Sequence, residues 1–255
     1  MSEHDIPPDG ITDVESWLKA RLGRCTASRI GDATRQLKKG GWGADRENYK
    51  MELIAERLTG QSKQRYISEA MVWGQQVERD ALLAYQARTG NVVDTSMWFA
   101  PHPTIEWSGA SPDALVGTDG MVQIKAPETS TFVKALLTKA IDPDHHAQVQ
   151  WEMACTGRKW SDLILFDPRI NDPRYRMIRW RIERDDLWIA NAEEMVRAFL
   201  KEIEDALATV NAEVALEPLP VIEPEAVTGW SDNVPQEQFS SIESLIAAGL
   251  VKKGM

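Results

Sequence analysis

The chain has 255 residues, 43% hydrophobic and 27% charged, a composition ordinary for a globular protein with one sizeable core. Its two cysteines are too few for a disulfide framework or a four-thiolate iron–sulfur cluster, and no apolar run reaches the roughly 18 residues that a membrane span needs. The net charge of −10, taken as a whole, argues against a partner such as nucleic acid.

The acidic charge is concentrated at the two ends of the chain. Residues 1–15 carry five acidic side chains and no Lys or Arg, and they lack the basic and then apolar pattern of a secretion signal. Residues 202–255 carry ten acidic side chains and only two lysines, which leaves a charge of +3 for residues 16–201. The sequence therefore predicts a cytoplasmic protein whose middle permits contacts with phosphate groups.

The first half of the chain reads as helices followed by strands. Asp13 is a suitable N-cap for a helix that Gly23 would end, and Thr26 or Ser28 could cap the next one. The predicted helices cover 13–23, 25–39, 47–59 and 69–88, with a loop at 40–49. Strand-like segments follow at 91–100, 105–117 and 121–127.

The second half completes a layered α/β domain. It contains a helix near 143–157, strands at 160–168 and 175–184, and a long amphipathic helix over 185–210. This order predicts a mixed central sheet flanked by helices. We expect an acidic N-terminal segment (1–15), one domain (16–210), and an acidic Pro-rich linker with a short C-terminal helix (211–255).

A hairpin at 111–127 carries the most informative pattern. Residues 123 and 125 are two apart on a predicted strand, so Gln123 and Lys125 share a face, and Asp113 precedes them across a turn that holds Gly117 and Gly120. Asp113 and Gln123 can thus face one divalent cation, with Lys125 placed to orient a water or stabilise charge on a phosphate. The competing interpretation is a surface hairpin with ordinary charges.

A second candidate is Glu78 in the predicted helix 69–88. It lies on the same helix face as Met71, Leu82 and Tyr85, where an ionised carboxylate is costly unless it is paired or binds a metal. Either an ion pair to a nearby arginine or a third metal ligand would account for it.

Two further segments have polar patterns with simple alternatives. Arg21 ends one predicted helix where Thr26 and Ser28 begin the next, which suits an anion site but equally suits plain helix capping. Gln148 and Gln150 flank Val149 on a predicted helix, where they could form an ordinary polar face.

Taken together, these segments resemble the phage lambda exonuclease or YqaJ-type viral recombinase family of the PD-(D/E)XK nuclease superfamily. The matching stretches, in chain order, are WLKARLGRCTAS, WGQQVERDA, SPDALVGTDGMVQIK, AQVQ and LILFDPR. They extend from about residue 17 to 185, and the acidic tail lies outside them. The resemblance implies a PD-(D/E)XK nuclease-like core.

The same resemblance implies an activity and partners. It indicates a Mg²⁺-dependent exonuclease, with Mn²⁺ as a substitute, that degrades linear double-stranded DNA from a 5′ end and leaves a 3′ overhang for a single-strand annealing protein. It further implies a ring-shaped homotrimer, encoded by a phage or prophage and acting in the cytoplasm of a bacterial host.

Carried over by position, the resemblance assigns the site residues. Asp113, Glu78 and residue 123 match metal-binding positions, Ile124 offers a backbone carbonyl to the metal, and Lys125 matches the catalytic lysine. A second set matches other positions around the DNA end: Gln150 as a catalytic-site glutamine, and Arg21, Ser28 and Thr26 as the 5′-phosphate site.

Gln123 departs from the family pattern, which has Glu there. Its amide oxygen can still bind a metal, but one negative charge is lost. Three explanations remain open: a native glutamine in a working enzyme, an engineered inactive form, or a DNA-end-binding module whose catalysis is impaired or lost. The retention of Asp113, Glu78 and Lys125 favours a nuclease.

Overall fold

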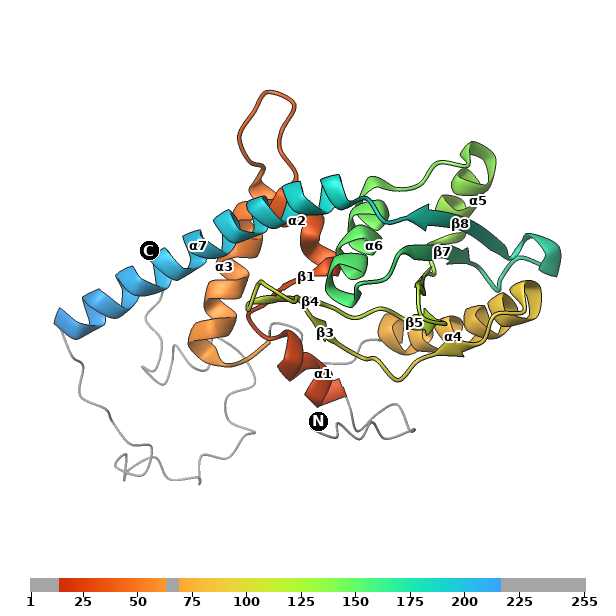
Figure 1. The fold of residues 1–255 in the computed structure, drawn as a ribbon, viewed down its shortest axis with the longest axis horizontal. Coiled ribbons are helices and arrows are strands. Elements are labelled where there is room, and N and C mark those ends of the chain that lie inside the picture. Colours follow the sequence, from red (N-terminus) through yellow and green to blue (C-terminus); the bar gives the residue numbers. More distant parts are fainter. Residues whose placement is uncertain (1–13, 63–68, 217–255) are drawn as a thin grey trace, which may run out of the picture. The chain divides into compact units, whose positions relative to one another are not determined.

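The computed structural model describes residues 14–62 and 69–216 (Figure 1). The helices are α1 (Val14–Arg21), α2 (Ile30–Thr34), α3 (Ala44–Thr59), α4 (Glu69–Thr89), α5 (Thr129–Thr138), α6 (Pro143–Thr156) and α7 (Asp186–Leu216), with 3₁₀ turns η1 (Ala27–Arg29) and η2 (Pro173–Tyr175). The strands are β1 (Cys25–Thr26), β2 (Val93–Asp94), β3 (Ala100–Pro101), β4 (Ser108–Ala110), β5 (Ala114–Val116), β6 (Gly120–Lys125), β7 (Trp160–Phe166) and β8 (Met177–Glu183).

The strands form two mixed sheets. The larger has the order β2-β5-β6-β7-β8, with β6 and β7 parallel and the other neighbours antiparallel. The smaller has the order β1-β4-β3, with β1 and β4 parallel. The predicted mixed α/β class is confirmed, and the sequence had indicated one sheet where the structure has two.

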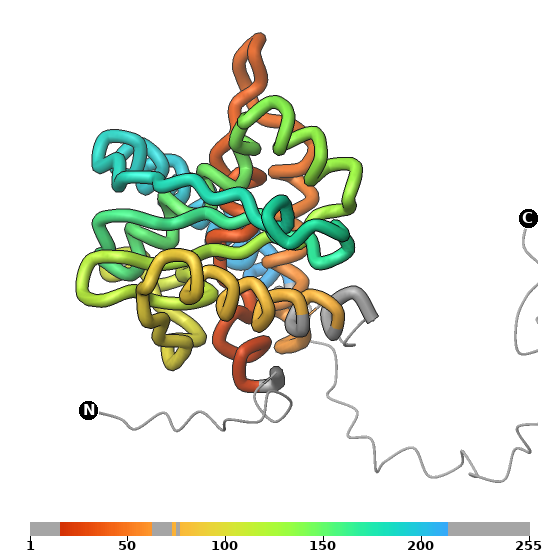
Figure 2. The backbone as a smooth tube through the Cα atoms, turned by 90° about the vertical axis from the view of Figure 1, so that its right-hand side faces the viewer, coloured from red at the N-terminus to blue at the C-terminus, as the bar shows by residue number. Residues whose placement is uncertain are grey.

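Helices cover both faces of the larger sheet. Side chains of α4, such as Val77 and Tyr85, pack with Val122 and Ile124 of β6 on one face. On the other face α5 and α6 pack through residues that include Phe132 with the alternate residues of β6 and β7. Figure 2 shows α4 in yellow-orange along the near side of the strands. Alternation along β6 thus directs its odd-numbered residues toward α6.

A second core surrounds the small sheet. It combines β1, α2 and α3 with Trp151 of α6 and with buried residues of α7, among them Val196 and Phe199. Because α6 contributes Val149 and Met153 to the sheet core and Trp151 to this one, α6 is buried on two sides.

Several element boundaries differ from those predicted. The expected helix 25–39 begins as β1, because Cys25 and Thr26 pair with Ser108 and Gly109 of β4, and only Ile30–Thr34 is α-helical. The predicted loop 40–49 is shorter, since α3 begins at Ala44. Before it, a narrow loop closed by a Gln36–Trp42 bridge extends from the domain in both views (Figures 1 and 2).

The expected strands 91–100 and 105–117 are divided into four short strands, β2 to β5. The helix α5 (Thr129–Thr138) was not predicted. By contrast, α6, β7 and β8 lie where the sequence placed them.

The chain divides into two compact units, residues 1–209 and 210–255, and only 210–216 of the second are described, as the end of α7. The predicted C-terminal helix and nearly all of the 1–15 segment lie outside the described residues. The domain boundaries therefore stay predictions.

Candidate active site

The β5–β6 hairpin brings Asp113 and Gln123 together. The antiparallel register pairs Ala114 with Val122, so Asp113, immediately before β5, lies opposite Gln123 of β6. Asp113 Oδ2 accepts hydrogen bonds from Gln123 Nε2 at 2.7 Å and from the Ile124 backbone N–H at 2.6 Å. The side-chain placement expected from the sequence is thus observed.

Gln123 has an unused oxygen in this arrangement. The residue is only 4% exposed, and its Oε1 has no hydrogen-bond partner while Nε2 donates to Asp113. A buried acceptor without a donor is costly, and a cation would satisfy it. Within the described residues there is no group of three or more His, Cys, Asp or Glu side chains placed to hold a metal. The oxygen donors present are of the kind that Mg²⁺ prefers.

Glu78 approaches the same place from α4. Burial raises the pKa of Glu78 to about 8, the charge of Asp113 adds to this increase, and Lys125 opposes it. Burial likewise raises the pKa of Asp113 to about 6, against the lowering effects of the Ile124 N–H, Lys125 and Gln123. Burial therefore opposes the ionised form of both carboxyl groups, Lys125 offsets only part of this effect, and a cation placed between them would favour ionisation. The charged groups that act on Glu78 are Asp113 and Lys125, and no arginine of the described residues is among them.

Lys125 is held from α6. Its Nζ donates to Gln148 Oε1 at 2.7 Å, and Gln148 Nε2 donates to Glu152 Oε1 at the same distance. Sequence reasoning had noted Gln148 only as part of a polar face and had missed Glu152. Their spacing of four residues, which places both on one helix face, was the available signal.

The structure does not bring Gln150 into this group. Gln150 Nε2 donates to the Glu183 carbonyl at 2.8 Å, and its Oε1 accepts from the Asp185 N–H at 2.9 Å. Two residues along a helix point to nearly opposite sides, so Gln148 and Gln150 cannot face the same site. Gln150 instead ties α6 to the turn between β8 and α7.

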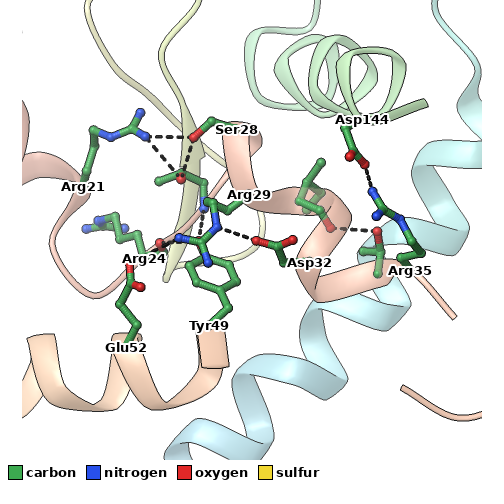
Figure 3. A network of polar contacts seen from close by, with 12 residues as sticks. Arg21, Arg24, Ser28, Arg29, Asp32, Arg35, Tyr49, Glu52 and Asp144 are labelled. Atoms are coloured by element: carbon green, nitrogen blue, oxygen red, sulfur yellow. Dashed lines mark hydrogen bonds and ion pairs between the residues drawn. The ribbon is translucent and has the colours of Figure 1, made fainter. Parts of the chain in front are cut away.

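Arg21, Thr26 and Ser28 converge as expected. Arg21 Nη2 donates to Ser28 Oγ at 3.1 Å and to Thr26 Oγ1 at 3.4 Å (Figure 3). Neither η1 nor α2 has a side-chain cap hydrogen bond, so the hydroxyls serve the arginine and not a helix end. These three residues line a pocket of about 360 Å³.

Arg24, Arg29 and Tyr49 also line the pocket. Figure 3 shows the Arg29 guanidinium between Tyr49, whose ring centroid is 4.3 Å away, and the carboxylates of Asp32 and Glu52, with which it forms ion pairs. Glu52 and Glu56 line the pocket too, where Glu52 pairs with Arg29 and Glu56 accepts from the Gly23 N–H. The remaining arginines, Arg21 and Arg24, beside the hydroxyl groups suit an anion such as phosphate.

Ser111 links the arginine cluster to the hairpin. Its Oγ accepts from Arg21 Nη1 and from Trp17 Nε1, both at 3.2 Å, and it lies two residues before Asp113. The Trp17 ring lies under the Arg21 guanidinium, 4.4 Å from its carbon. Sequence reasoning quoted this serine within the motif but did not assign it a role. The Arg21 pocket and the β5–β6 hairpin are therefore adjacent in the fold.

None of the described helices combines the length and the apolar composition required to cross a membrane. No curated protein matches this chain in sequence.

Solved structures resemble it closely. The alkaline exonuclease LHK-Exo from Laribacter hongkongensis is 40% identical with a TM-score of 0.72, over 80% of this chain and 99% of that one. The same protein in complex with dAMP gives a TM-score of 0.73 at equal identity and coverage. A phage related exonuclease from Haemophilus somnus 129PT shares the fold at 14% identity, with a TM-score of 0.56 over 73% of this chain and 96% of that one.

The profile described as "YqaJ-like viral recombinase domain" matches residues 16–159, a stretch that contains the arginine cluster, the acidic hairpin and Lys125. The chain therefore belongs to the YqaJ-like viral recombinase family.

Proposed function

We propose that this chain is a metal-dependent exonuclease that degrades linear double-stranded DNA from 5′-phosphorylated ends and leaves 3′ single-stranded overhangs. The observation that supports this proposal is that two groups of residues are adjacent. Asp113, Gln123 and Lys125 form the first group and the Arg21 pocket is the second, and Ser111, two residues before Asp113, accepts a hydrogen bond from Arg21 of the pocket. The first suits a scissile phosphate and the second a terminal one. The similarity to exonucleases, one of which binds dAMP, supports a DNA substrate.

The proposed metal ligands are Asp113, Gln123 Oε1, the Ile124 carbonyl and Glu78. Mg²⁺ bound there, or Mn²⁺ in its place, would polarise the scissile phosphate and lower the pKa of a bound water. Lys125 is placed to stabilise the charge that develops on the phosphate. Arg21, with Thr26 and Ser28, would hold the 5′-phosphate and so set the position of the DNA end.

The biological setting is part of the same proposal. The overhang would pass to a single-strand annealing protein during phage-type recombination, in the cytoplasm of a bacterial host. Three copies of the chain would enclose the DNA as a ring, which mass measurement in solution tests directly against the 28.7 kDa of one chain.

The test is digestion of linear, 5′-phosphorylated duplex DNA with Mg²⁺, comparing the chain with its Gln123→Glu variant. If both proteins release nucleotides, Gln123 works as a metal ligand. If only the Gln123→Glu variant releases them, the amide at position 123 is what prevents cleavage. Covalently closed circular DNA is the control, because an exonuclease needs an end. Cleavage of the circle would contradict the proposal.

A second candidate is a DNA-end-binding recombination module without catalysis. The observation that favours it is the amide at position 123, which removes a negative charge from the proposed metal site. Binding of DNA ends without cleavage by either protein would support this candidate.

A further inference from the structure

A buried chain of hydrogen bonds connects Lys125 to the interior of α6. Lys125 Nζ donates to Gln148, and Gln148 donates to Glu152, each at 2.7 Å. An amide carries its oxygen and its nitrogen on opposite arms. When Gln148 Nε2 donates to Glu152, the Gln148 oxygen must point toward Lys125. The hydrogen bond to Glu152 therefore orients the amide for the hydrogen bond from Lys125.

Glu152 is an unusual residue for a helix buried on two sides. Its side chain is 0% exposed, and Oε2 has no hydrogen-bond partner. Burying a carboxylate that is incompletely satisfied costs free energy, and an apolar side chain of similar size would pack here without that cost. Burial and the charge of Asp113 raise the pKa of Glu152 to about 8, whereas Lys125, Gln148 and Arg21 oppose this rise, so the groups that favour its ionised form belong to the candidate site.

The surroundings of Glu152 allow little movement. Val149 and Met153 are anchored in the sheet core and Trp151 in the second core, so α6 is fixed on either side of the hydrogen-bonded face. Gln148 and Glu152, one helical turn apart, project from this helix toward the odd-numbered residues of β6. Because α6 is fixed, Gln148 and Glu152 can restrict the position of the Lys125 ammonium group more than solvent could.

We propose that Glu152 is a positioning residue for Lys125: it orients the Gln148 amide, and through that amide it holds the lysine ammonium group beside Asp113 and Gln123. Only the expected effect on kcat depends on the proposed nuclease function. The hydrogen-bonded chain itself exists in the protein whether or not the chain cleaves DNA.

The kinetic test compares Glu152→Leu, which removes the acceptor, with Glu152→Gln, whose side-chain carbonyl can still accept from Gln148. We expect Glu152→Leu to lower kcat by about 10- to 100-fold, with KM for DNA ends nearly unchanged and no fall in the melting temperature. Glu152→Gln should retain most of the activity. Thr156→Val is the matched control, because it removes a hydrogen bond of the same helix that does not lead to Lys125.

A double-variant cycle shows whether the effect passes through Gln148. Gln148→Leu should lower kcat as much as Glu152→Leu, and the double variant should lose no more than either alone. Losses that multiply would overturn the proposal, as would an unchanged kcat in Glu152→Leu.

A measurement without DNA separates this proposal from the proposed function. Amine-directed labelling followed by peptide mass spectrometry reports the reactivity of each lysine. At fixed pH, Glu152→Leu and Gln148→Leu should raise the labelling rate of Lys125 at least about threefold, since the amine loses its hydrogen-bonded restraint. The exposed Lys134 and Lys139 should be unaffected. If the rate at Lys125 does not change, Glu152 does not hold the lysine, even in a chain that cleaves DNA.

Discussion

At the scale of single residues, the site is defined by buried acidic groups whose ionisation burial opposes. Burial disfavours the ionised form of Glu78 and of Asp113, the charge of Asp113 adds to this effect at Glu78, and Lys125 offsets only part of the cost. The consequence is a dependence of stability on pH that a metal should modify.

In metal-free protein, the free energy of unfolding should fall as pH rises. The pKa of Glu78 is raised from 4.5 to about 8 and that of Asp113 from 3.8 to about 6. A carboxyl with a raised pKa binds its proton more tightly in the folded chain, so its stabilising contribution is complete below the unfolded pKa and is lost as pH rises through the folded one. Thermal melts in EDTA between pH 5 and pH 9 measure this loss.

Magnesium should reduce the loss, because a bound cation favours the ionised carboxylates. Glu78→Gln is the matched variant, and its melting temperature in EDTA should depend less on pH than that of the parent chain. A metal-free protein whose stability rose over this range would contradict the assignment of buried acids.

Arg21 should determine the preference for phosphorylated ends. Arg21→Ala removes the donors that reach Ser28, Thr26 and Ser111. Hydrogen bonds to charged groups are worth about 1.5–3 kcal/mol, so the ratio of digestion rates on 5′-phosphate and 5′-hydroxyl ends should fall by about 10-fold or more.

The control for this comparison is Arg35→Ala. Arg35 forms an ion pair with Asp144 at the surface (Figure 3), and its removal should leave the ratio unchanged. An equal change in both variants would mean that arginine charge in general, and not the Arg21 pocket, attracts the DNA end.

At the scale of elements, α6 has two polar faces with different tasks. Gln148 faces β6 and Lys125, whereas Gln150 faces the turn between β8 and α7. The family resemblance assigns Gln150 to the catalytic site, and the hydrogen bonds indicate a structural contribution, so the two residues invite a direct comparison.

Gln150→Ala should destabilise the fold by about 1–3 kcal/mol, because it removes two hydrogen bonds and leaves a small cavity. Its kcat per folded molecule should stay close to that of the parent chain. Urea unfolding and single-turnover digestion together measure both quantities. Gln148→Ala should give the reverse pattern, and a large loss of kcat in Gln150→Ala without destabilisation would favour the catalytic assignment.

At the scale of the whole molecule, charge is divided between the body and the ends of the chain. Residues 16–201 carry +3 although the chain carries −10, so the body is the part suited to DNA. Affinity for duplex ends should therefore weaken with added salt, although the protein is acidic.

This salt dependence is measured as the slope of the logarithm of the DNA-binding constant, log K, against the logarithm of the salt concentration. Each phosphate contact contributes about −0.9 to this slope, and Arg21→Ala should reduce its magnitude by about 1. Fluorescence anisotropy with an end-labelled duplex in a catalytically silent buffer containing Ca²⁺ provides the data. A slope of zero would exclude binding through phosphate contacts.

Long periodic segments were predictable from local pattern. The α6, β7, β8 and α7 segments have clear hydrophobic periods, and the structure places them as expected, except that α7 continues to Leu216, six residues into the predicted linker. The region 91–117 was not predictable in detail. Its four strands have two or three residues each, and they form only because partners distant in sequence, such as Cys25 opposite Ser108, supply the other half of the hydrogen bonds.

The sequence by itself determined the chemistry of the hairpin: the two-residue period of a strand directs Gln123 and Lys125 to one face, and a short turn returns the chain to Asp113. Tertiary structure alone decided what surrounds that hairpin. Which face of α6 meets Lys125, and so whether Gln148 or Gln150 contacts it, depends on how the helix rotates to fill two cores. The contact between Ser111 and Arg21 spans 90 positions, and no local pattern encodes such a distance.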